Sequence, residues 1–181
     1  MFKRLLIYLE LGLPAALMVC FEWWLFEILA ILAGLISVEA LAAEVIIVTI
    51  VSFLFMIPLG CSFAASAFTG FFCASGKIKE AKKYTRLTVA FGELITLLAL
   101  GVVFLFENKI SHFFTRDEKV VQIVSDCLKI LYVYIAFDSI HGTNSGIIRG
   151  LGRTTMAALV TFSCYWIIGL GGAIYLGFTK Q

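Results

Sequence analysis

Five long apolar runs dominate this 181-residue sequence and limit the folds that it can adopt. They lie at about 13–36, 41–72, 87–106, 119–148 and 155–178. Each run approaches or exceeds the roughly 20 residues that an α-helix needs to cross a bilayer core. Because that core holds no water for open backbone groups, a membrane segment must be a helix or a barrel strand. The sequence lacks ten-residue segments of alternating polarity, so five transmembrane helices are predicted.

The composition favours a membrane protein and argues against several other classes. Apolar residues make up 61% of the chain and charged residues 14%, whereas a soluble domain carries about 25% charged residues. The five cysteines form no CxxC pair, and the sequence contains neither HExxH nor a phosphate-binding glycine loop. We therefore predict a single all-α transmembrane domain over 1–181 in a lipid bilayer. No enzymatic activity, cofactor, metal site or nucleic-acid partner is indicated.

Positive charge is divided unequally between the two sides of the predicted membrane. Five crossings place the N-terminus and the joints at 76–86 and 149–153 on one side with nine cations, and leave four on the other. The positive-inside rule then predicts a cytoplasmic N-terminus for a multi-pass protein of the plasma membrane or of a vacuolar or other organelle membrane. We interpret the basic joint at 76–86 as a topology signal, with contact to anionic headgroups as the alternative.

Two glutamates, Glu22 and Glu27, lie inside the first apolar run and flank Trp23 and Trp24. An acidic residue at the centre of a membrane helix costs roughly 3 kcal/mol, which favours a proton or cation site that faces a cavity. Their five-residue separation turns them about 140° apart, so they do not form one narrow stripe. The alternative is that a neighbouring helix satisfies one of them. The two tryptophans either pack or line a cavity for an organic cation.

Asp138 lies deep in the fourth apolar run and is the third candidate for the proton or cation site. His141 follows it by one helical turn and, as histidine titrates near neutral pH, would suit a proton relay. The alternative is that His141 only orients Asp138 or caps a carbonyl. Tyr134 and His141 are interpreted as possible cavity-lining residues. Glu93 lies in the third run, and the sequence allows two directions for its side chain, toward the bundle or toward the headgroups.

Small residues and one proline predict helix contacts. Pro58 removes a backbone donor from the second run, which predicts a kink and a possible hinge there. Gly142, Gly146 and Gly150 repeat every four residues in the fourth run, a spacing typical of closely packed membrane helices.

Four sequence strings together resemble the multidrug and toxic compound extrusion (MATE) family of eukaryotic type. The string LPAALMVCFEWWLFE at 13–27 resembles the start of the seventh helix of that family. The strings FMIPLG at 55–60, GIIRGLG at 146–152 and YWIIGL at 165–170 resemble parts of its eighth, tenth and eleventh helices. The chain departs from the family pattern at FTGFF, 68–72, and at Thr154 and Gly171.

The resemblance implies a partial C-terminal bundle of a transporter that exports organic cations in exchange for protons, or for sodium ions. Glu22, Glu27 and Asp138 would then line the cavity of this bundle. Alternating access needs two bodies, so the resemblance also implies a missing N-terminal bundle or a partner chain, and we expect a fragment of a longer protein. The alternatives are a non-transporting membrane subunit or remnant, and a flippase of the wider superfamily for lipid-linked cargo.

Overall fold

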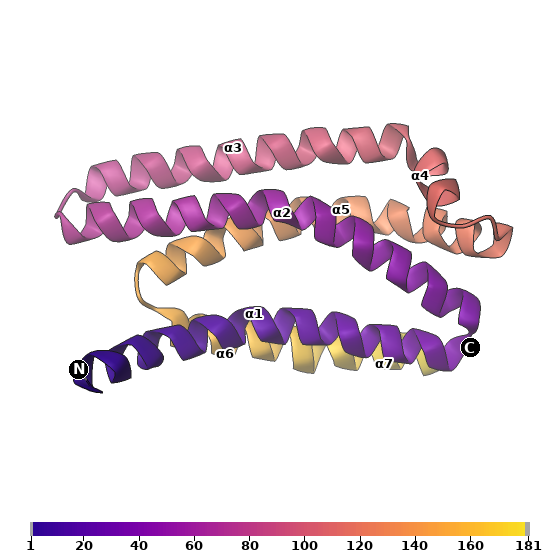
Figure 1. Ribbon diagram of the computed structural model, residues 1–181, viewed down its shortest axis with the longest axis horizontal. Helices are drawn as coiled ribbons and strands as arrows, with labels where there is room; N and C mark the ends of the chain where they lie inside the picture. The colour runs from indigo at the N-terminus through magenta and orange to yellow at the C-terminus, as the bar shows by residue number, and fades with distance from the viewer. Residues whose placement is uncertain (1, 180–181) are drawn as a thin grey trace. The chain divides into compact units, whose positions relative to one another are not determined.

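The computed structural model describes residues 2–179, which form helices joined by short turns (Figure 1). In chain order the helices are α1 (Phe2–Ile36), α2 (Val38–Ala74), α3 (Ile78–Leu105), α4 (Glu107–Phe114), α5 (Glu118–Gly150), α6 (Thr154–Phe162), the π-helical turn η1 (Ser163–Gly169) and α7 (Leu170–Thr179). Within residues 2–179, five stretches are long and apolar enough to cross a membrane: Tyr8–Ile36, Val38–Ala74, Ile78–Leu105, Glu118–Gly150 and Thr154–Gly177. The predicted all-α class with five membrane helices is confirmed.

The helix ends differ from the predicted joints in three places. Ser37 alone separates α1 from α2, and its hydroxyl accepts a hydrogen bond from the Ala40 amide at 3.0 Å. This cap satisfies an amide at the start of α2, which therefore begins before position 41. Most of the basic joint at 76–86 is the first part of α3, because lysine, glutamate and alanine favour a helix that extends into water. The stretch between the third and fourth apolar runs, at 107–118, contains the short helix α4.

The chain divides into two compact units, and each is described by itself. Unit 1 comprises Met1–Leu32 and Gly152–Gln181, and unit 2 comprises Ala33–Leu151. The sequence-based expectation of one domain over 1–181 stays a prediction.

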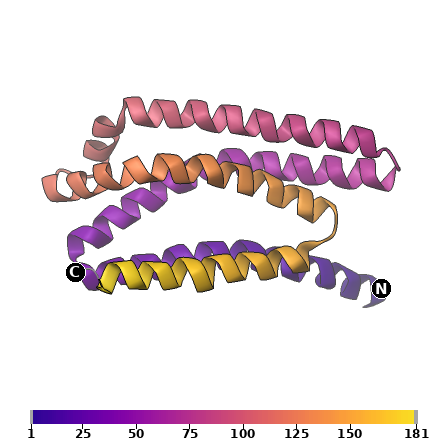
Figure 2. The same cartoon turned by 180° about the vertical axis from the view of Figure 1, so that it is seen from behind.

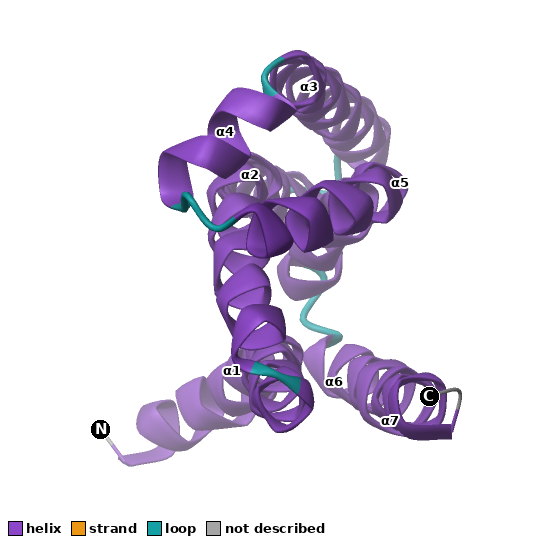
Figure 3. Cartoon of the chain, turned by 90° about the vertical axis from the view of Figure 1, so that its right-hand side faces the viewer, coloured by secondary structure: helices purple, strands orange, loops and turns teal. Residues whose placement is uncertain are grey.

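Unit 2 is a bundle of α2, α3 and α5, with α4 at one end. Figures 1 and 2 show α3 beside the later half of α2 and α5 crossing α2, and these helices contact one another. Figure 3 shows α4 between the end of α3 and the start of α5. The largest apolar side chains buried at the centre belong to α5, where Val124 and Leu128 are at most 1% exposed. They pack against aliphatic residues of α2 such as Ile46 and Ile50.

The glycine repeat of α5 lies against α2, at Pro58 and in the part of the helix that follows it. A Cβ atom on Gly146 would lie 2.0 Å from the Ser62 carbonyl oxygen, and one on Gly150 would lie 2.5 Å from that of Ser66. Beside this contact the Arg149 guanidinium donates a hydrogen bond to the Ser62 hydroxyl at 2.7 Å. The prediction that the repeat marks a close helix contact is therefore confirmed, and α2 is the partner.

Pro58 lies at the middle of α2, which stays helical through it. The helix changes direction about midway along its length in Figure 1. Proline removes one backbone hydrogen bond and its ring crowds the preceding turn, which explains a bend at this point. Pro58 is also buried and faces Gly142 of α5. Its role as a hinge stays a prediction.

Candidate functional site

Glu22 and Glu27 lie on α1 in unit 1 and differ in their surroundings. The Glu22 side chain is half-buried, whereas that of Glu27 is exposed. Trp23 is half-buried, and Trp24 is 50% exposed. The different exposure of the two carboxylates agrees with their large angular separation around the helix. The two glutamates therefore meet different surroundings.

An aromatic group of unit 1 fixes the backbone immediately before Glu22. The ring of Phe21 lies 5.0 Å from that of Phe162 and 6.4 Å from that of Trp166, centroid to centroid. The Trp166 indole donates a hydrogen bond to the Phe21 carbonyl at 3.0 Å. Trp166 belongs to η1, and π-helical turns inside α-helices occur frequently at functional sites. This turn thus holds the segment of α1 that carries the first glutamate.

Asp138 lies in α5 of unit 2, and its side chain is only 6% exposed. Tyr134 lies one helical turn earlier, on the same face of α5. His141, one turn later, places Nδ1 at 3.9 Å from an Asp138 carboxylate oxygen, beyond hydrogen-bonding distance. The three candidates of α5 therefore lie along one face of the helix, with the carboxyl group of Asp138 in the middle. A proton relay between Asp138 and His141 stays a prediction.

Glu93 faces the bundle and not the headgroups. It is half-buried on α3, and the Ser139 hydroxyl of α5 donates a hydrogen bond to it. Ser139 is the chain neighbour of Asp138, so this bond ties α3 to α5 beside the candidate aspartate. The sequence singled out Glu93 because it is an acidic residue within an apolar run. Its partner Ser139 lies 46 positions away and was not predicted.

Glu107 lies between the third and fourth apolar runs of the sequence, and its carboxylate has a structural role. Its two oxygens accept hydrogen bonds from the hydroxyls of Ser125, at 3.1 Å, and Tyr132, at 2.9 Å. Glu107 begins α4, whereas both donors belong to α5. These bonds hold the short helix α4 against the end of the three-helix bundle.

Replacing Glu107 by alanine is expected to destabilise unit 2. Two hydroxyls would lose their acceptor, which lowers the free energy of unfolding by about 1–3 kcal/mol. Thermal unfolding of the purified protein in detergent measures this change. Glu118→Ala is the matched control, because Glu118 is 82% exposed and its pair with the exposed His112, at 3.7 Å, is a type of contact worth about 0–1 kcal/mol. Equal melting temperatures for the two variants would contradict the structural role.

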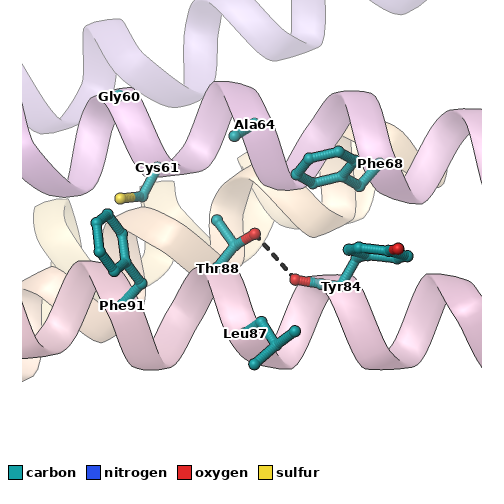
Figure 4. A pocket seen from close by; sticks show the side chains of 8 residues that line it. All are labelled: Gly60, Cys61, Ala64, Phe68, Tyr84, Leu87, Thr88 and Phe91. Carbon is teal, nitrogen blue, oxygen red and sulfur yellow. Dashed lines mark hydrogen bonds between the residues drawn. The ribbon is translucent and has the colours of Figure 1, made fainter.

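An apolar hollow of about 480 Å³ lies between α2 and α3 (Figure 4). Cys61, Phe68, Tyr84 and Phe91 are among its lining residues, and none of the lining side chains is charged. Without a carboxylate this hollow has nothing to neutralise an organic cation. The carboxylates of α1 and α5 are the groups suited to that task. Whether Glu22, Glu27 and Asp138 share one cavity concerns both units and stays a prediction.

Comparisons with a protein-family model and with individual proteins indicate the same family. A protein-family model described as MatE matches residues 14–174. Multidrug and toxin extrusion protein 1 of Danio rerio is 32% identical over 171 residues, which are 94% of this chain and 29% of that protein. Multidrug and toxin extrusion protein 2 of Homo sapiens is 33% identical over 174 residues, 96% of this chain and 29% of that protein. The chain thus spans about three tenths of the length of these relatives. No solved structure matches the chain.

Proposed function

The chain belongs to the MatE family, and on this basis we propose that it is part of a transporter that exports organic cations in exchange for protons. The observation that carries the proposal is the buried carboxylate of Asp138 inside an apolar membrane helix. Intramembrane acids are costly, and they typically mark ion or substrate paths. The names of the relatives, which concern multidrug and toxin extrusion, support the same class of cargo.

In the proposed mechanism, Glu22, Glu27 and Asp138 alternate between two charge states. A deprotonated carboxylate attracts a cation, and proton uptake from the acidic side removes that charge and releases the cargo. Trp23 and Trp24 would offer ring faces to the cation, and Tyr134 and His141 would line the cavity. We propose protons as the coupling ion, with sodium ions as the second choice.

Transport by alternating access needs a second body, because a cavity opens to either side only when two bodies move against each other. We propose that an N-terminal bundle or a partner chain supplies it, with this chain as part of the C-terminal bundle. The nine cations on one side favour a cytoplasmic N-terminus, in the plasma membrane or in an organelle membrane.

Glu22→Gln tests the proposal in the complete transporter. The amide has the shape of the carboxyl group and never carries its charge, so efflux of an organic cation driven by a pH gradient should fall at least about tenfold, or about 1.4 kcal/mol. Uptake of radiolabelled tetraethylammonium into everted vesicles measures the rate. Glu39→Gln is the control, because Glu39 lies in the first turn of α2 at the end of the membrane span. Full efflux by Glu22→Gln would reject the assignment of Glu22 to the coupling site.

A further inference from the structure

The basic end of unit 2 contains a second hollow, of about 410 Å³, where α2 ends and α3 begins. Helix α3 lines it with Ile78, Ala81, Lys82, Thr85 and Arg86. Helix α2 contributes Thr69 and Cys73, and the end of α5 contributes Ile147 and Leu151. The hollow is therefore enclosed by three helices, all within unit 2.

The lining of this hollow is amphipathic. Its lining surface is almost entirely apolar, and two of its lining side chains, Lys82 and Arg86, each end in a cation. The Thr69 and Thr85 hydroxyls lie 3.2 Å apart and form a hydrogen bond with each other, which joins α2 to α3 at the hollow. An apolar hollow beside two cations matches a molecule with a hydrocarbon chain and a phosphate.

Charge and position both favour a lipid as that molecule. The segment at 77–86 carries five cations and one acidic residue, Glu80, and lies at the end of two helices long enough to span a bilayer. Basic hollows between membrane helices at this level are the usual sites for anionic headgroups. The hollow of Figure 4, on another side of α3, shares the apolar lining but has no cation.

We propose that this hollow binds one anionic phospholipid, with its phosphate beside Lys82 and Arg86 and the start of an acyl chain along Ile147, which lies farther from the helix ends than Leu151. The bound lipid bridges the ends of α2, α3 and α5 and therefore stabilises unit 2. This binding is independent of the proposed transport and does not need the carboxylates of α1 and α5. A general attraction of basic residues to a negatively charged membrane surface would, in contrast, involve all cations of the segment alike.

The test compares two double variants that remove the same charge. Lys82→Gln with Arg86→Gln, the lining variant, alters the two cations of the hollow, whereas Lys79→Gln with Lys83→Gln alters cations of the same helix that do not line the hollow. Native mass spectrometry of the detergent-purified protein, with phosphatidylglycerol or phosphatidylcholine added, measures the retained lipid. We expect the lining variant to lose about tenfold or more in phosphatidylglycerol retention and the control to stay within about twofold of the unchanged protein.

Two further measurements distinguish a bound phospholipid from surface attraction and from a free phosphate. Phosphatidylglycerol should raise the melting temperature of the unchanged protein and of the control, but not of the lining variant, while phosphatidylcholine should leave all three unchanged. Soluble glycerol phosphate should not compete, because it lacks the chain that fills the apolar hollow. Equal loss of lipid in both double variants, or full competition by glycerol phosphate, would overturn the proposal.

Discussion

Gly146→Ala is expected to lower the free energy of unfolding of unit 2 by about 3 kcal/mol or more, because it places a methyl group inside the backbone of α2. The added Cβ atom would lie 2.0 Å from the Ser62 carbonyl oxygen and 2.6 Å from its carbonyl carbon. A flexible side chain can turn away from such a contact, but a helix backbone can only move as a whole. Overpacking of this kind costs about 1–3 kcal/mol, and the larger values apply when backbone must shift.

A graded glycine series makes this prediction sharp. Gly101→Ala, in α3, is the matched control, because no residue that the structure describes lies within 4 Å of its added Cβ and alanine favours a helix by about 1 kcal/mol over glycine. Gly142→Ala should fall between the two, since its Cβ meets the ring edge of Phe55 at 3.1 Å. Thermal unfolding and elution profiles of the purified proteins give the order. A melting temperature for Gly146→Ala within about 2 °C of that for Gly101→Ala would contradict so close a contact.

The same contact shows how far the sequence alone could go. The four-residue glycine spacing predicted a close helix contact, but it did not name the partner. The structure places Gly146 against Ser62 and Gly150 against Ser66, both in the part of α2 that follows Pro58. Spacing along one helix shows which of its faces carries small residues. The choice of partner depends on how the helices are arranged in space.

The sequence could not name the distant partners of polar residues. Glu107 lies outside the apolar runs, and its donors Ser125 and Tyr132 lie 18 and 25 positions later. The Trp166 indole reaches the Phe21 carbonyl across 145 positions. Periodicity and charge counts report the environment of a residue along its own helix. They carry no information about which side chain another helix brings to it, so the polar pairs had to come from the structure.

Asp138→Asn is expected to abolish the coupling of cation binding to pH while leaving the fold intact. Asparagine keeps the size of aspartate and a side-chain oxygen that accepts hydrogen bonds, so the melting temperature should change by no more than about 2 °C. The lost charge is the larger effect. A cation about 4 Å from a carboxylate gains about 4 kcal/mol at an effective dielectric constant of 20, so we expect affinity to fall about a hundredfold or more after partial compensation.

The dependence on pH separates this charge effect from a packing effect. Aspartate is charged at high pH and neutral at low pH, so cation binding to the unchanged protein should weaken as the pH falls, and binding to the asparagine variant should not respond. Equilibrium binding of tetraethylammonium to the complete transporter across a pH series measures both slopes. Asp126→Asn is the control on the same helix, because Asp126 is exposed and already pairs with Lys129 at 2.9 Å. If the Asp138→Asn variant kept the pH dependence of cation binding of the unchanged protein, the coupling site would have to be another carboxylate. Glu22 would be the next residue to test.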